Sequence, residues 1–144
     1  GDDTDGHIDT LARFCDAETI AYQSCADRDD PHYAALREME TELQALRRAN
    51  GAAYRLVPLP WPGVVHDAGG RRLPATYANF LIVNGAVLVP TYNDAADAGA
   101  LKALAGAFLG RSIVPVMCRP LIHQYGSLHC VTMQLPSDVV PDKV

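Results

Sequence analysis

The sequence lacks long apolar runs, an excess of basic residues and paired cysteines. None of its apolar stretches approaches the roughly 20 residues that a membrane-spanning helix needs, so a membrane protein is not expected. Twelve Lys and Arg residues stand against 17 Asp and Glu, which leaves a net charge of −5. Because nucleic-acid affinity comes largely from neutralised phosphates, a nucleic-acid-binding protein is not expected either. An acidic pocket for a cationic small molecule suits this charge balance better.

The four cysteines show neither a CxxC pair nor the spacing of metal ligands. A chain of 144 residues that is 49% hydrophobic can build one sizeable core without disulfides. We therefore expect reduced thiols and a cytoplasmic location. The chain begins with Gly1 rather than Met, inside a motif, which favours its being a piece of a longer protein. The cysteines are Cys15, Cys25, Cys118 and Cys130.

Two strands, a helix and a third strand recur along the chain and predict an α+β fold. The two units cover about residues 6–59 and 76–117, and a closing strand is expected over 129–135. Asn84-Gly85 predicts a tight hairpin turn in the second unit, because this pair supplies positive φ angles. Repeats of this length suggest blades that cover one another. The expected strands are 8–15, 19–24, 54–59, 80–83, 86–89 and 113–117, and the expected helices are 31–48 and 94–110.

An acidic cluster that contains one imidazole opens the chain. If a strand starts near Gly6, the side chains of His7 and Asp9 share a face of it. Three readings stay open for the cluster: a solvated acidic turn, a set of divalent-cation ligands, or a substrate site. In the substrate site, a carboxylate would hold a cation while His7 moves protons. The members of the cluster are Asp2, Asp3, Asp5, His7 and Asp9.

A second cluster lies near the C-terminus, where a small-residue loop at Gly126-Ser127 leads into the expected strand that carries Cys130. A cysteine at such a junction combines access with rigid support, as a nucleophile requires. The alternative is a free cysteine that serves as a small core residue. Strand alternation would turn His129 to the opposite face, so His129 is not the expected base for Cys130.

Together the two clusters resemble the family of agmatine deiminases and bacterial-type peptidylarginine deiminases. The resemblance rests on Asp-Asp-Thr-Asp-Gly-His-x-Asp over residues 2–9, on Asn79-Phe80, and on His-Cys-x-Thr over residues 129–132. These motifs follow the family's order over essentially the whole chain. The resemblance implies the pentein fold, a five-bladed α/β propeller, of which this chain would supply about two ββαβ units and an extra strand.

The resemblance also implies a site and its chemistry. His7, Asp9 and Cys130 would be catalytic. Asp9 would bind the substrate together with Asp3 and Gly126, and no metal or other cofactor would take part. Asp9 would hold a guanidinium, Cys130 would attack its carbon, and His7 would protonate the departing ammonia. A covalent amidino-cysteine would then be hydrolysed to a ureido product, with agmatine, peptidyl-arginine or free arginine as the substrate.

Two departures from the family pattern bear on activity. The glycine run and the Asn that usually precede His-Cys are replaced by residues 124–128, of which Gly126 keeps the small-residue character. The family's other catalytic carboxylates come from blades N-terminal to this chain. We therefore expect the isolated chain to be inactive and prone to associate. Its expected partners are a cationic guanidino molecule and the N-terminal half of the propeller, and a homo-oligomer stays open.

Two other classes of function also stay open. A metal-dependent hydrolase would use the acidic cluster as its ligands, although the sequence offers no second histidine-containing cluster. A non-catalytic binding or assembly piece would place the acidic turn on the surface and Cys130 in the core. Activity that is insensitive to chelators argues against the first class, and a reactive Cys130 argues against the second.

Overall fold

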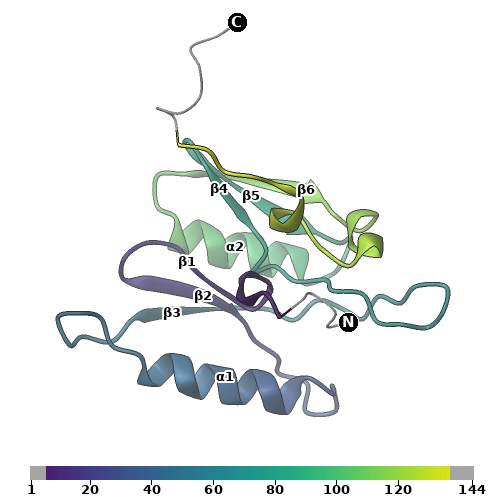
Figure 1. Cartoon of the computed structure of the whole chain (residues 1–144), viewed down its shortest axis with the longest axis horizontal. Helices are drawn as coiled ribbons and strands as arrows, with labels where there is room; N and C mark the ends of the chain where they lie inside the picture. The colour runs from purple at the N-terminus through teal and green to yellow at the C-terminus, as the bar shows by residue number, and fades with distance from the viewer. Residues whose placement is uncertain (1–5, 137–144) are drawn as a thin grey trace, which may run out of the picture.

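The structure is a computed structural model that describes residues 6–136, with two small sheets, two α-helices and three 3₁₀ helices, η1 to η3 (Figure 1). The α+β class predicted from the sequence is confirmed. No helix within the described residues is both long and apolar enough to cross a membrane. In chain order the elements are η1 (Ile8–Thr10), β1 (Ala12–Phe14), β2 (Thr19–Gln23), α1 (Tyr33–Ala45), β3 (Arg55–Leu59), β4 (Leu81–Val83), β5 (Ala86–Thr91), α2 (Asp97–Ala107), β6 (Ser112–Met117), η2 (Leu121–Gln124) and η3 (His129–Val131).

Each sheet has three strands, and the two sheets share one topology. An antiparallel pair comes first, β1 with β2 or β4 with β5, and a parallel strand, β3 or β6, follows the helix. A parallel neighbour needs a crossover connection, which α1 and α2 supply. Ile20 pairs with Leu56 in the first sheet, and Leu88 pairs with Val114 in the second. Two strands, a helix and a strand therefore occur twice in succession.

The main core surrounds α2, which lies between the two sheets and contacts β2, β3 and β6 (Figure 1). Ala100 and Leu104 of this helix are fully buried. The rings of Phe80 and Phe108 meet edge to face beside it, with their centroids 5.5 Å apart. α1 packs less closely, because Leu36 is the one buried residue within it. Met39 and Leu43 on the same side of this helix are half-buried, and Leu46 directly after it is exposed.

Both α-helices begin later than the sequence predicts, and an aspartate, Asp30 or Asp94, lies just before each of them. Asp30 forms an ion pair with Arg72, and Asp94 accepts a hydrogen bond from the backbone amide of Gly63. The N-cap positions lie two residues further along in both cases. Each carboxylate also accepts a hydrogen bond from the backbone amide two residues further on, at 2.9 and 2.8 Å, and so combines a local turn bond with its long-range contact.

Two expected strands are wrong in part or in whole. The segment 8–15 begins with η1 and only then forms β1. The closing strand expected over 129–135 is absent, because η3 comes first and residues 132–136 have no regular structure. Apolar and polar residues alternate there, but the backbone amide of Thr132 donates to the carbonyl of His129 instead of a neighbouring strand. Backbone hydrogen bonds within this turn therefore replace the hydrogen bonds to a neighbouring strand that the prediction requires.

The segment 60–74, rich in Gly and Pro, contains an ordered hairpin that extends to the right in Figure 1. The amide of Leu73 donates to the carbonyl of Val65 over 2.7 Å, and both side chains are buried. His66 and Arg72 form a backbone bridge next to this pair. We call this element the 65–73 hairpin.

Candidate functional site

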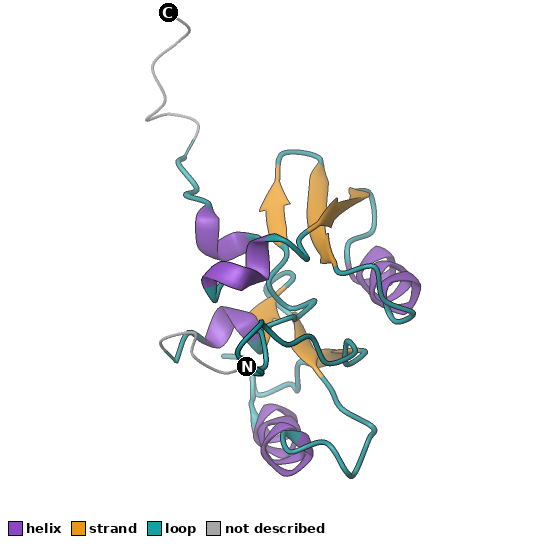
Figure 2. Ribbon diagram, turned by 90° about the vertical axis from the view of Figure 1, so that its right-hand side faces the viewer, coloured by secondary structure: helices purple, strands orange, loops and turns teal. Residues whose placement is uncertain are grey.

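The N-terminal and C-terminal motifs meet on the side of the sheets that carries the 3₁₀ helices, away from α2 (Figure 2). Nδ1 of the His129 imidazole lies 2.7 Å from Oδ2 of Asp9, although the two residues are 120 positions apart. Their side chains are 27% and 22% exposed, so the pair is sheltered but reachable from solvent. η1 and η3 thus build one polar site from opposite ends of the described chain.

Asn79 is fully buried between Asp9 and the residues of η3. Its Nδ2 donates to Oδ2 of Asp9 over 3.0 Å, and its Oδ1 accepts from the backbone amide of His129 over 2.8 Å. Sγ of Cys130 lies 3.5 Å from the same Oδ1. Because a carboxylate accepts and a backbone amide donates, the side-chain amide of Asn79 has a single orientation. One side chain therefore links the carboxylate to the cysteine.

A buried network holds the segment 76–79 in place. Oε1 of Gln23, at the end of β2, accepts a hydrogen bond of 3.0 Å from the amide of Tyr77. The hydroxyl of Tyr92 bonds to the backbone amide and carbonyl of Thr76, at 3.0 and 2.8 Å. Buried polar groups that all find partners specify one arrangement, because leaving any of them unpaired is costly. The position of Asn79 is consequently set by strands of both sheets.

Gly126 leaves room for Cys130. A Cβ at position 126 would lie 2.9 Å from Cβ of Cys130 and 3.5 Å from its Sγ. On the C-terminal side of Gly126, Oγ of Ser127 lies 2.7 Å from the buried hydroxyl of Tyr92. The backbone at Gly126 therefore forms a wall beside the thiol. We call residues 125–130 the cysteine turn.

Gly126→Ala is expected to displace Cys130, because the added methyl group overlaps its side chain. Overpacking of this kind costs roughly 1–3 kcal/mol, and a shift of about 1 Å in a reacting group can lower kcat on the order of 10²-fold. The measurements are the alkylation rate of Cys130, resolved by peptide mass spectrometry, and the free energy of unfolding. Gly106→Ala in α2 is the matched control, since a Cβ there meets nothing within 4 Å. An unchanged alkylation rate in Gly126→Ala would contradict the expectation.

Cys130 differs from the other cysteines in exposure and in its surroundings. Cys130 is exposed, whereas Cys25 and Cys118 are buried. Burial raises the pKa of the Cys25 and Cys118 thiols, and it raises the pKa of Cys15 to about 11. Those three thiols therefore stay protonated and unreactive near neutral pH. Among the described cysteines, Cys130 is the most exposed, and Cys15 is half-buried.

Arg13 of β1 adds a positive charge beside the site. Its guanidinium carbon lies 4.9 Å from the centroid of the Phe80 ring, and it donates to the carbonyl of Phe80. Burial lowers the pKa of Arg13, while the neighbouring Asp9 and Cys130 raise it. The guanidinium still carries its charge near neutral pH.

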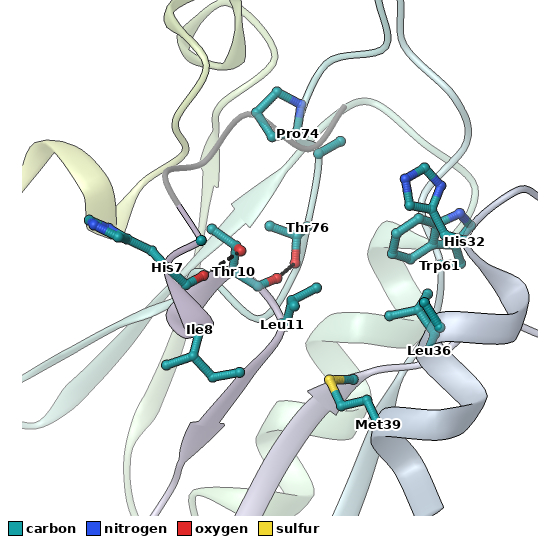
Figure 3. A pocket seen from close by; sticks show the side chains of 13 residues that line it. His7, Ile8, Thr10, Leu11, His32, Leu36, Met39, Trp61, Pro74 and Thr76 are labelled. Atoms are coloured by element: carbon teal, nitrogen blue, oxygen red, sulfur yellow. Dashed lines mark hydrogen bonds between the residues drawn. The ribbon is translucent and has the colours of Figure 1, made fainter.

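The structure does not bring His7 into this group. His7 precedes η1, is exposed, and lines an apolar pocket of about 270 Å³ that also contacts α1. Figure 3 shows its ring pointing away from Trp61 on the opposite wall. Neither Asp9 nor Cys130 lines this pocket, so the pocket is separate from the site at Asn79. Asp3 lies outside the described residues, and its substrate-binding role stays a prediction.

Sequence reasoning missed His129 and Asn79 as site residues. The opposite-face argument for His129 assumed a strand, and it is wrong because η3 is a 3₁₀ turn. In that turn the imidazole of His129 contacts Asp9, and Cys130 contacts Asn79. The available signal for Asn79 was a polar amide inside the otherwise apolar run 77–83. Its partners could not be read from the sequence.

No group of three or more His, Cys, Asp or Glu side chains within residues 6–136 is arranged to hold a metal ion. The metal-ligand reading of the acidic cluster also involves Asp3 and Asp5, which lie outside this range. Asp9, a described member of the cluster, is already engaged by His129 and Asn79.

Known proteins are similar to this chain in both sequence and structure. The agmatine deiminase of Pseudomonas putida is 33% identical over 155 residues, which cover 96% of this chain and 42% of that protein. A crystal structure from Porphyromonas gingivalis with the provisional name arginine deiminase is 59% identical, with a TM-score of 0.90, and covers 94% of this chain and 40% of that one. A C. jejuni agmatine deiminase, solved as a cysteine-to-serine variant with substrate bound, is 44% identical, with a TM-score of 0.80 over 89% of this chain and 36% of that one.

The chain spans about 42% of the length of the curated relatives that it matches. The family described as Porphyromonas-type peptidyl-arginine deiminase matches residues 1–136, which is nearly the whole sequence. The matched range includes both motifs that meet at Asn79. The chain therefore belongs to the Porphyromonas-type peptidyl-arginine deiminase family.

Proposed function

We propose that this chain supplies the C-terminal catalytic part of a deiminase that hydrolyses a guanidinium group to a ureido group and ammonia. The observation that carries the proposal is the convergence of Asp9, His129 and Cys130 on one buried amide, Asn79. The names of the similar proteins, arginine deiminase and agmatine deiminase, support the reaction class. The substrate is a guanidine of the agmatine or arginine type.

Asp9 is suited to hold the guanidinium cation. Its contacts with His129 and Asn79 both use Oδ2, which leaves Oδ1 to accept an N–H of the substrate in this proposal. A charge-assisted hydrogen bond to Oδ1 would place the planar cation beside the thiol of Cys130. Because Asn79 fixes Asp9 relative to Cys130, the attacking sulfur and the guanidinium carbon would be held near their reactive geometry.

The proposed reaction has two halves. In the first, the Cys130 thiolate adds to the guanidinium carbon and forms a C–S bond, which gives a tetrahedral intermediate. His7 delivers a proton to one nitrogen, the C–N bond breaks, and ammonia leaves. In the second, water attacks the S-amidino-cysteine and passes a proton to His7, the C–S bond breaks, and the ureido product leaves. Each guanidinium consumes one water and releases one ammonium.

His7 would approach Cys130 in the complete enzyme, because the structure places it exposed and next to residues outside the described range. The proton transfer is proposed for His7 and not for His129, because the motif resemblance assigns it to the histidine of Gly-His-x-Asp, while Nδ1 of His129 contacts Asp9. The role proposed for His129 is to hold Oδ2 of Asp9. Replacing each histidine by glutamine separates the two roles: the loss of kcat is expected in His7→Gln, and a rise in KM is expected in His129→Gln.

We also propose that the chain completes its site only with the N-terminal half of a five-bladed pentein propeller. The 42% span of its relatives supports this arrangement. Asp9 holds a guanidinium from one side, and a planar cation with several N–H groups needs further acceptors on its other edges. Those acceptors would come from the remaining blades. The 144-residue chain alone would therefore release no appreciable ammonia from agmatine.

The test uses the full-length deiminase that contains this chain, with agmatine and with a peptidyl-arginine as separate substrates. We expect one ammonia for each ureido product with at least one of them. An acid quench during turnover should trap an amidino adduct on the peptide that carries Cys130, detected by mass spectrometry. The 144-residue chain alone is the control. Failure to form a ureido product from either substrate would refute the function, and turnover without the adduct would refute the covalent route.

A further inference from the structure

Tyr125 has a backbone conformation that residues with a Cβ rarely adopt. Its φ is 64° and its ψ is 25°, at the C-terminal end of η2 and directly before Gly126. The left-handed region is disfavoured because Cβ then approaches the following carbonyl oxygen too closely. A residue held there indicates stabilising contacts from outside its own turn.

Two residues of the 65–73 hairpin hold the side chain of Tyr125. Its hydroxyl donates to Oδ2 of Asp67 over 2.9 Å, and the guanidinium carbon of Arg71 lies 4.3 Å from the ring centroid. The second distance is typical of a cation–π contact. Bonds from the Arg71 amide and the Tyr125 hydroxyl lower the pKa of Asp67, so the carboxylate that accepts them is ionised near neutral pH. The tip of the hairpin therefore binds the side chain of Tyr125, the residue before Gly126.

The hairpin is braced internally at its tip and anchored to the rest of the chain at its base. At the tip, Oδ1 of Asp67 accepts from the backbone amides of Gly69 and Arg71 over 2.8 and 2.9 Å. At the base, the guanidinium of Arg72 binds the sheltered carboxylate of Asp30 through two bonds of 2.9 and 3.1 Å. A planar two-bond pair of this kind restricts both orientation and distance. The hairpin is thus a stiff connection between the segment before α1 and the cysteine turn.

We propose that the 65–73 hairpin is a strap that positions the cysteine turn, with Tyr125 as the positioning residue. Tyr125 fixes one side of Gly126, and the buried hydrogen bond of Ser127 fixes the other. The backbone between them forms the wall against Cys130. The strap therefore limits how far the thiol can move. The catalytic consequence rests on the proposed function, whereas the restraint on the thiol does not.

The first test is Tyr125→Phe, which removes the bond to Asp67 and keeps the ring. In the full-length enzyme we expect kcat to fall roughly three- to ten-fold, as the loss of one such bond implies, with KM unchanged within about two-fold. The alkylation of Cys130 by iodoacetamide should become faster by a similar factor, because the wall beside the thiol loosens. Tyr54→Phe is the matched control, since the ring of Tyr54 contacts Phe14 of β1 and belongs to neither the 65–73 hairpin nor the cysteine turn.

The second test is Arg72→Lys, which keeps the charge at the base of the strap and removes the two-bond fork. A stiff strap predicts faster alkylation of Cys130 in this variant as well. Unchanged alkylation and kcat in Tyr125→Phe would overturn the proposal, and unchanged alkylation in Arg72→Lys would overturn the strap as a rigid link. A loss of kcat matched by a lower unfolding midpoint would show a purely structural role and also overturn it. If the enzyme hydrolyses no guanidine, the proposed function fails while the alkylation tests still decide on the strap.

Discussion

Cys130→Ala is expected to abolish guanidinium hydrolysis in the full-length enzyme, with a loss of at least roughly 10⁴-fold in kcat. The reason is that the proposed route passes through a C–S bond, and no neighbouring group can form it. His129 is held by Asp9, and the other described thiols are shielded. The measurement is ammonia and ureido product under saturating substrate. Substrate binding should persist, because Asp9 is untouched.

Cys15→Ala is the matched control for this prediction. Burial raises the pKa of the Cys15 thiol to about 11, so it carries almost no thiolate at neutral pH and should not contribute to turnover. We expect kcat in Cys15→Ala to stay within about two-fold of the unmodified enzyme, as for a change away from the reacting atoms. Substantial turnover in Cys130→Ala would remove Cys130 as the nucleophile, whatever the control shows.

Asn79→Ala is expected to lower kcat on the order of 10²-fold, because the carboxylate and the thiol lose their common tether. Nδ2 of Asn79 holds Oδ2 of Asp9, and its Oδ1 holds the amide of His129 beside Cys130. Truncation leaves both partners without the bond and opens a cavity at a fully buried position, which costs roughly 1–3 kcal/mol for the unsatisfied groups alone. The measurements are kcat, KM and urea unfolding of the full-length enzyme.

Two further variants separate the loss of the Asn79 hydrogen bonds from a general loss of stability. Asn79→Asp keeps the shape but replaces the donor with an acceptor opposite the Asp9 carboxylate, so it should lose activity as fully as Asn79→Ala. Asn50→Ala, at an exposed turn where the side chain accepts from the Ala52 amide, is the matched control. A variant Asn79→Asp with normal kcat would show that the hydrogen bond to Asp9 has no part in positioning.

The place of the site explains why it depends on the whole fold. Asp9 enters before the first sheet, Asn79 lies in the segment that connects the two units, and Cys130 follows the second sheet. Gln23 at the end of β2 fixes the connecting segment, so the first sheet positions a residue that serves the cysteine. A substitution that disturbs either unit should therefore change the position of the Cys130 thiol.

Local signals in the sequence were enough to predict most elements of the fold. Asn84-Gly85 predicted a tight turn with positive φ angles; the turn lies between β4 and β5, where Gly85 has a φ of 75° but Asn84 does not have a positive φ. Helical periodicity located both α-helices, although their starts were placed too early, because Asp30 and Asp94 lie in the turn before the first helical residue. Hairpin turns and helices close their hydrogen bonds within a few residues, so neighbouring side chains carry the information.

The sequence by itself determined the α+β class, the order of the elements and, through its motifs, that Asp9 and Cys130 are candidate partners. Only the tertiary structure decided that His129 pairs with Asp9, that Asn79 joins them, and that the segment after Cys130 is not a strand. The physical reason is that a side-chain amide or imidazole has no preferred partner along the chain. Its contacts are selected by which buried groups remain unpaired after the sheets have packed.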